Sequence, residues 1–322
     1  MRMQGFYRSV GPRLAVLWLA SAAAMACRGD SNAGPSGDAS ATSGQAALAP
    51  APAGQVPERQ HEDFDPKQFS HPTAISNPYS PMKPGTRYTF EGTTIEDDGT
   101  AVPHRVVINV TDLTKVIGGV RSVVSWDLDY SDNQLVEAEL AFFAQDDHGN
   151  VWRMGEYPEE YEDGKLLAAP TWIHGIEEAV AGIEMRANPE PGSPSYSQGW
   201  GPGVKFTDRG QVDQAGQKTC VPVKCYEDVV VIAEVSGAEK DAQQLKYFAR
   251  DVGNIRVGWR GKGEKTKETL ELVTVEQLSA AALAEVRAAA LKLEQSAYAT
   301  SKNVYAKTPP LEPATSAQGT GS

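Results

Sequence analysis

The chain has 322 residues, with 42 Asp and Glu against 30 Lys and Arg, so its formal net charge is −12. No cluster of Lys and Arg offsets this acidity, and we therefore predict that nucleic acid is not a partner. A chain of this charge is also not attracted to an anionic membrane surface, so membrane attachment, if it occurs, is expected to be through a lipid.

The first 26 residues have the composition of a secretory signal peptide. Arg2, Arg8 and Arg13 precede an apolar run, LAVLWLASAAAMA, that is too short for a comfortable permanent membrane span. Loss of these three arginines would change the formal charge from −12 to −15. Residues 27–60 are rich in Ala, Gly, Ser and Pro, and this composition predicts a flexible, disordered tether.

The residues at the end of this apolar run, Ala24-Met25-Ala26-Cys27, resemble a bacterial lipobox. The resemblance implies cleavage before Cys27 and a lipid on its sulfur, which places the protein in the cell envelope. Arg28 after the cysteine implies the outer membrane, if the source has two membranes. Ala24 stands where a lipobox usually has Leu, so an ordinary signal peptide with a chance cysteine is the alternative.

Residues 61–275 carry a succession of strand patterns. The first strand is predicted at 86–95, with Tyr88 and Phe90 inward, and the next ones around Val106 to Val110 and Val124 to Tyr130. Further strands are predicted at 229–235, 245–249 and 255–259, and a last one around 270–272 is expected to close the sheet, whereas 168–203 suggests long irregular loops. This pattern predicts a mainly β fold: an antiparallel meander forming a barrel, half-barrel or curved sheet.

The clearest hairpin lies between Leu135 and Glu156. Apolar residues occupy every second position of its first arm, and Glu137 and Glu139 alternate with them. Trp152 and Met154 continue the alternation after a polar turn. We expect the apolar face to lie on the core and the acidic face to lie in water.

The C-terminal region changes period and composition. Strong helix formers after Ser279 predict a helix within 276–304, for which Ser279 is a candidate N-cap. Packing on the sheet is the plain interpretation of this helix, and plugging a barrel end or docking a partner is the alternative. Residues 305–322 are predicted to be a disordered tail.

Three stretches resemble an uncharacterised family of bacterial secreted proteins and lipoproteins: NPYSPMKPGTRYTFEG, FAQDDHGNVWRMGEYPEEYEDGK and AGIEMRANPEPGSPSYSQGWGPG. The first contains the motif N-P-Y-x-P-x-K-P-G-x-x-Y, and the likeness extends from about Asn77 to Trp259. It implies a β-rich envelope domain and no known activity. The cysteines of TCVPVKCY depart from the expected Pro/Gly turn.

Cys220 and Cys225 are separated by four residues that could form a hairpin loop. Outside the cytosol such a pair tends to oxidise, so we predict a disulfide, which contributes about 2 kcal/mol because the loop is small. A metal site is the alternative, but two cysteines without neighbouring ligands fall short of a structural zinc set. We predict no metal and no cofactor.

Three other motifs are weak candidates for metal binding or catalysis. Residues 146–150, DDHGN, resemble the start of a calcium loop, but His148 and the missing downstream Glu favour a plain turn. The acidic run from Glu156 to Asp163 is expected to be a solvated strand face rather than a cation site. His174 with Glu177 and Glu178 supports an alternative hypothesis of an envelope hydrolase, without an assigned catalytic residue.

The functional hypothesis is a non-enzymatic envelope lipoprotein that binds a hydrophobic ligand or a protein partner. Six aromatic residues are candidates for lining the ligand site: Trp126, Phe142, Trp152, Trp172, Trp200 and Trp259. A hydrolase and a structural surface protein are the alternatives.

Overall fold

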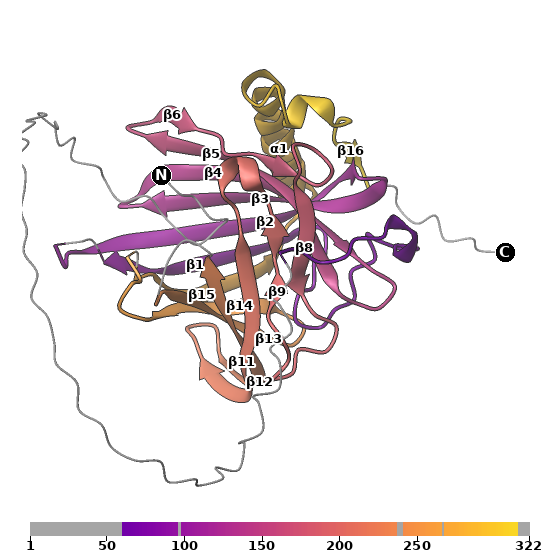
Figure 1. Ribbon diagram of the computed structural model, residues 1–322. Helices are drawn as coiled ribbons and strands as arrows, with labels where there is room; N and C mark the ends of the chain where they lie inside the picture. The colour runs from indigo at the N-terminus through magenta and orange to yellow at the C-terminus, as the bar shows by residue number, and fades with distance from the viewer. Residues whose placement is uncertain (1–59, 96–97, 237–240, 266, 315–322) are drawn as a thin grey trace, which may run out of the picture. The chain divides into compact units, whose positions relative to one another are not determined.

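Five long antiparallel strands follow one another in the computed structural model (Figure 1). They are β1 (Thr86–Ile95), β2 (Ala101–Ile117), β3 (Val120–Ser131), β4 (Gln134–Gln145) and β5 (Val151–Glu162). Each pairs with the next one along the chain. The bounds of β1 are those predicted from its alternation, and the predicted hairpin is formed by β4 and β5.

The structure describes residues 60–95, 98–236, 241–265 and 267–314. The predictions made for the signal peptide, for Cys27 and for the tether up to residue 59 lie outside these residues. The same is true of the tail from residue 315 onward.

The second half of the domain supplies another antiparallel run. Its strands are β11 (Asp208–Cys220), β12 (Cys225–Ser236), β13 (Gln243–Ala249), β14 (Gly253–Arg260) and β15 (Thr269–Gln277). Because β15 pairs with both β14 and β1, the two runs form one continuous sheet. The predicted strand around 270–272 is confirmed, but it joins the two runs within the sheet and is not the place where the sheet closes.

Short strands bring the two edges of the sheet together. β8 (Val180–Met185) pairs with β5 and with β10 (Gly199–Trp200), while β9 (Tyr196–Ser197) pairs with β11. Only Gln198 separates β9 from β10, so the sheet nearly closes into a barrel, and the predicted fold class is confirmed. β6 (Lys165–Ala168) and β7 (Trp172–Ile173) also pair with β5, so the prediction of irregular loops over 168–203 missed these strands.

The apolar face of the β4–β5 hairpin is covered by the C-terminal helix. Leu140, Phe142 and Met154 belong to a buried cluster that includes Ala290 and Leu293 of helix α1 (Ala280–Thr300). Figure 1 shows this helix, in yellow, beside the magenta strands. The helix therefore packs on the outside of the sheet, and the hydroxyl of Ser279 caps it by accepting from the backbone N–H of Ala282 at 3.2 Å.

The opposite face of the hairpin lies inside the barrel, which corrects the prediction of a solvated acidic face. Glu137 and Glu139 are 6% and 0% exposed. In the acidic run from 156 to 163, Glu156, Glu159 and Glu160 are also buried and are not part of a solvated face, whereas Glu162 and Asp163 at its end are exposed. Both faces of these strands are buried, one by the helix and the other by the barrel interior.

The residues after the helix are packed on the domain, whereas the sequence predicted a disordered tail from residue 305. They form a 3-10 helix, η3 (Tyr305–Lys307), and a short strand, β16 (Glu312–Pro313), that pairs with β2. Tyr305 and Leu311 are buried. We call residues 305–314 the C-terminal strap.

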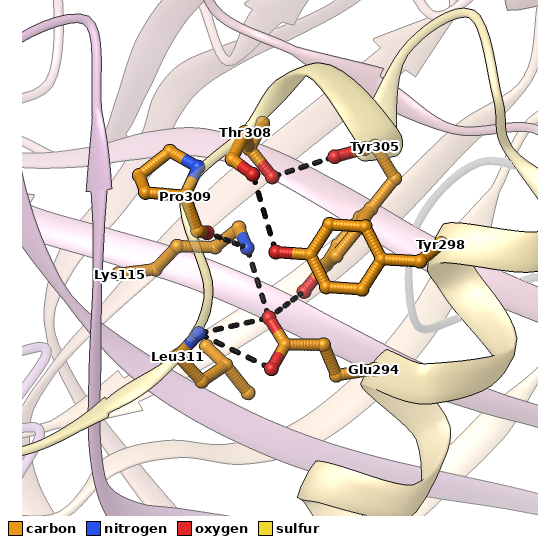
Figure 2. Close-up of polar contacts among 7 residues, drawn as sticks. All are labelled: Lys115, Glu294, Tyr298, Tyr305, Thr308, Pro309 and Leu311. Carbon is orange, nitrogen blue, oxygen red and sulfur yellow. Dashed lines mark hydrogen bonds and ion pairs between the residues drawn. The ribbon is translucent and has the colours of Figure 1, made fainter.

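A buried ion pair joins the strap, the helix and the sheet (Figure 2). Lys115 of β2 is fully buried, and its Nζ donates to Glu294 Oε1 at 3.0 Å and to the carbonyl of Pro309 at 2.7 Å. Glu294 also accepts from the Tyr305 hydroxyl at 3.2 Å and from the Leu311 N–H at 2.9 Å. Two partners from the strap thus converge on one carboxylate of the helix.

The β11–β12 hairpin ends at the predicted disulfide. Cys220 and Cys225 are paired residues of the two strands, with their Cα atoms 3.9 Å apart, and they form a disulfide bond. The turn between them places Val221 against the core. The bridge therefore closes the end of a hairpin and fixes its register.

Candidate functional site

The inside of the barrel contains a cavity of about 90 Å³ that is open to solvent. Its apolar walls come from four strands and from the segment before β1, through Met82, Tyr88, Phe90, Ile108, Phe143 and Phe248. Polar and charged side chains line another part of it: Ser125, Asp127, Arg153 and Glu184. The prediction that Tyr88 and Phe90 point inward is confirmed by their place in this lining.

The proline-rich segment before β1 helps to form the cavity. Tyr79 is buried, and Ser80 and Pro81 are among the lining residues. Two partly exposed residues, Val252 of the β13–β14 turn and Asn254 of β14, complete the lining near this segment. These residues mark the side from which a small molecule could enter.

An irregularity in β5 places the central cation of the site. In a regular strand, residues 153 and 156 would point to opposite faces. The pairing of β4 with β5 shifts between Phe142, opposite Gly155, and Phe143, opposite Arg153, so Met154 is an extra residue. This β-bulge turns Arg153 and Glu156 to the same inner face. Gly155 fits the bulge because its φ of 148° is unfavourable for other residues, and a Cβ there would lie 2.6 Å from the Trp172 carbonyl oxygen.

Arg153 is bound by two carboxylates. Its Nη1 donates to Glu156 Oε2 at 2.8 Å, and its Nε donates to Glu184 Oε2 at 3.1 Å. Burial alone would lower the pKa of Arg153, but Glu184 and Glu156 outweigh this and raise it well above its usual value. Because the guanidinium also lies 5.3 Å from the centre of the Phe143 ring, its charge is well compensated within the protein.

Asp127 of β3 presents an unused acceptor at the cavity. Its Oδ2 accepts from the Ser125 hydroxyl at 2.8 Å, whereas its Oδ1 has no hydrogen-bond partner among the described residues. The residue is 3% exposed. Burial raises the pKa of Asp127 to about 8, although Ser125 and Arg153 partly oppose the rise.

Glu137 and Glu139 of β4 add to the acidity of the interior. Asp127 is the cross-strand partner of Glu139, and Asp129 is that of Glu137. Neither carboxyl oxygen of Glu139 has a hydrogen-bond partner among the described residues. Burial, followed by repulsion from neighbouring carboxylates, raises the pKa of both glutamates well above its usual value.

Two further cations lie inside the barrel. His104 Nε2 lies 2.5 Å from Asp129 Oδ1, and His104 Nδ1 lies 2.9 Å from Glu268 Oε1, an ion-pair distance without hydrogen-bond geometry. Burial alone would lower the pKa of His104, but Asp129 and Glu268 raise it to about 10. Lys246 Nζ lies 2.6 Å from Glu234 Oε2. Every one of these cations has an acidic partner.

The buried ionisable groups inside the barrel predict that the domain is less stable at alkaline pH than at mildly acidic pH. The pKa values of Asp127, Glu268 and His104 are raised to about 8, 7 and 10 on folding, so the folded state binds more protons than the unfolded state. The stability that each group contributes is fully present below its unfolded-state pKa. It is lost as the pH rises through the pKa that the group has in the folded state. We expect the free energy of unfolding to be at least about 2 kcal/mol lower at pH 9 than at pH 5.5, a decrease in melting temperature of about 4–8 °C. Thermal melts in buffers of equal ionic strength would measure this, and a melting temperature that rises toward pH 9 would contradict it.

The predicted aromatic residues do not surround this cavity. Phe142 and Trp152 lie in the cluster under helix α1, and Trp126 packs against the same cluster. Trp172 stacks on Phe206, with ring centres 4.8 Å apart. Trp200 is half-buried in β10, and Trp259 is 39% exposed on β14. A role in binding for these six residues stays a prediction.

His174, Glu177 and Glu178, the residues of the hydrolase hypothesis, contact different parts of the domain. The His174 ring lies 4.1 Å from that of Phe64, and its Nδ1 accepts from the Ala181 N–H at 3.1 Å. Glu177 is exposed and forms an ion pair with Lys307, and Glu178 is exposed. Among the described contacts, none joins His174 to either glutamate. Burial lowers the pKa of His174, which agrees with a neutral packing residue.

The motif at residues 146–150 is a hairpin turn. Asp146 accepts from the N–H groups of His148 and Asn150, and from Trp152 Nε1 at 2.8 Å. These bonds occupy both carboxyl oxygens. Across the described residues, no group of three or more His, Cys, Asp or Glu side chains is arranged to hold a metal ion. Within the same ranges, no helix is both long and apolar enough to cross a membrane.

Comparisons with known proteins leave the site without an assigned role. No family model matches the chain, and no curated protein matches it. A solved structure from Bacteroides fragilis, named as an exported protein with a YMCC-like fold, is 13% identical over 62% of this chain and 99% of its own, with a TM-score of 0.37. A structure from Parabacteroides distasonis, named as a lipoprotein, is 12% identical with the same coverage and a TM-score of 0.31. At these TM-scores the likeness assigns neither a family nor an activity to this chain.

Proposed function

We propose that this protein is a non-enzymatic, lipid-anchored envelope protein that takes one end of a small amphiphilic ligand into the barrel cavity. The observation that carries the proposal is the cavity itself, whose apolar walls lead to a buried carboxyl oxygen with no partner among the described residues. A buried polar group without a partner is costly, and a ligand that supplies one would remove that cost.

The size of the cavity limits the ligand. At about 90 Å³ it is far smaller than the ~300–1,000 Å³ of pockets that enclose drug-sized molecules. A ligand would therefore insert one small end, with its polar group toward Asp127. The remainder would lie near Met82 and Val252 at the open side.

The envelope location is supported by the sequence signals and by the redox chemistry. The N-terminal apolar run followed by Cys27 is the basis for export and lipidation. A disulfide between Cys220 and Cys225 suits a protein that works outside the cytosol, where such bonds persist. The outer membrane is the expected destination in a cell with two membranes.

Native mass spectrometry of the protein purified from its own envelope tests the proposal. We expect a bound mass on the natural protein that is lost when Val252→Trp fills the open side of the cavity. Val275→Trp is the matched control, because Val275 is 41% exposed and does not line the cavity. Thermal melts of both variants would verify that they fold. A bound mass retained equally by both variants would contradict binding in this cavity, and so would a clean unliganded mass for the natural protein.

A further inference from the structure

We propose that the ligand of the barrel cavity is an organic cation, whose amine or ammonium group lies between Asp127 and the aromatic walls. This inference rests on the proposed function, because it names the chemical class of the ligand for that same cavity. It follows from three properties of the lining. The positive charge of Arg153 is compensated by carboxylates, one carboxyl oxygen of Asp127 has no hydrogen-bond partner among the described residues, and aromatic rings form the walls.

The positive charge in the cavity lining is already paired with carboxylates of the protein. Arg153 is the cation of the lining, and it is bound to both Glu156 and Glu184. An anionic ligand would have to compete with these two carboxylates for the guanidinium while lying close to Asp127. Such a ligand would bring a further negative charge into an interior where burial and repulsion between carboxylates already raise the pKa of Glu137 and Glu139.

The acidic group of the lining that lacks a partner is Asp127. Asp127 is almost fully buried and lines the cavity, yet its Oδ1 accepts no hydrogen bond from a described residue. An ammonium N–H would complete this carboxylate, and a charge-assisted hydrogen bond of this kind is stronger than one between neutral groups. Asp127 is paired with Glu139 of the adjacent strand β4, and it lies near Arg153 of β5 and Glu184 of β8. Of these three residues, only Arg153 is positive.

The walls suit a cation better than a neutral polar group. Four aromatic rings line the cavity: Tyr88, Phe90, Phe143 and Phe248. Aromatic faces attract amines and quaternary ammonium groups, especially where water is excluded. Phe143 already contacts the Arg153 guanidinium in this way. A cavity of about 90 Å³ has room for an ammonium head with a short alkyl stem, by comparison with the ~30 Å³ share of one water molecule.

The test compares four small probes of similar size on the purified full-length protein: n-butylammonium, tetramethylammonium, n-butanol and butyrate. Binding is followed by NMR chemical shifts at about pH 8.5, above the pKa of about 8 that burial gives Asp127, where the amine is still protonated. We expect n-butylammonium, which can donate an N–H to Asp127, to bind at least tenfold more tightly than butanol. Tetramethylammonium has no N–H, and it should also bind more tightly than butanol, through its charge and the aromatic rings. Butyrate should bind no more tightly than butanol.

Two variants assign the effect to the carboxylate. Asp127→Asn keeps the shape but removes the charge, and it should weaken n-butylammonium binding roughly ten- to a hundredfold while leaving butanol binding unchanged. Glu91→Gln, at an exposed position of β1, is the matched control and should change neither. Val252→Trp provides a second test that does not depend on the folding of Asp127→Asn, since it should reduce the binding of every probe.

The outcomes separate the two proposals. Butanol or butyrate binding as tightly as the cations, with all binding lost in Val252→Trp, would overturn the cation inference and leave the cavity as a ligand site. Cation binding that is unchanged in Asp127→Asn would also overturn it. Binding of none of the probes, together with a clean unliganded mass from the envelope, would overturn both the inference and the proposed function.

Discussion

Replacing Arg153 with methionine should destabilise the domain by about 3–5 kcal/mol at neutral pH. The guanidinium is 7% exposed and compensates Glu156, which is almost fully buried, and Glu184. Removing one partner of a buried ion pair leaves an uncompensated charge, which costs about this much. Urea denaturation followed by circular dichroism would measure the difference.

The pH dependence of this effect identifies its cause. Burial alone would raise the pKa of Glu184, but Arg153 and Lys246 lower it, so this carboxylate contributes stability above its unfolded-state pKa that is lost in acid. The penalty in Arg153→Met should therefore shrink in acid, where Glu184, left without Arg153, can be protonated. Arg121→Met is the matched control: the Arg121 side chain is 41% exposed in its pair with Glu312, so its loss should cost less than about 1 kcal/mol. Equal costs for the two variants would mean that the interior pair does not stabilise the fold.

Replacing Glu294 with alanine should have a similarly large effect on the other side of the sheet. Lys115 would remain fully buried without its carboxylate, and the Leu311 N–H and the Tyr305 hydroxyl would lose their acceptor. We expect a loss of about 3–5 kcal/mol. The strap should also separate from the sheet, because its Tyr305 hydroxyl and its Leu311 N–H both donate to this carboxylate (Figure 2).

Hydrogen exchange distinguishes detachment of the strap from general destabilisation. In Glu294→Ala, the amide protons of Leu311, Glu312 and Ala314 should exchange faster than those of β3 and β4. Glu285→Ala, at an exposed position of the same helix, is the control and should leave the exchange and the melting temperature nearly unchanged. The double variant Lys115→Met with Glu294→Leu should recover much of the lost stability, since an apolar pair can replace a buried ion pair. Protection of the strap in Glu294→Ala equal to that in the natural protein would show that the buried pair does not hold it.

Strand positions and the C-terminal helix could be predicted because they depend on local patterns. Alternation placed the meander up to Glu156, and strong helix formers after Ser279 placed the helix together with its cap. The disulfide could be predicted because its two cysteines sit across a short turn. Each of these inferences needs only residues that are close in the sequence.

The direction of each strand face could not be predicted. Alternation divides β4 into an apolar and an acidic face, but it does not show that a helix from residue 280 onward covers the first while the second lines a barrel. For this reason Phe142 and Trp152, offered as ligand residues, lie under the helix, and the cavity is lined instead by Phe143 and Arg153.

Two further features depend on distant partners or on backbone geometry. The strap has the Pro-rich composition of a disordered tail, and its packing rests on Lys115, a residue more than 190 positions away from Pro309. The β-bulge that turns Arg153 inward follows from pairing with β4 and from the conformation of Gly155. An isolated glycine within a strand pattern was the available signal for that bulge.

A crystal structure of the protein purified from its own envelope, without added ligands, tests most directly whether the cavity is a ligand site. We expect non-protein density between the rings of Tyr88, Phe90 and Phe143, with one polar atom within about 3.2 Å of Asp127 Oδ1. Ordered water alone in the cavity, with Asp127 Oδ1 bonded only to that water, would contradict the proposed function.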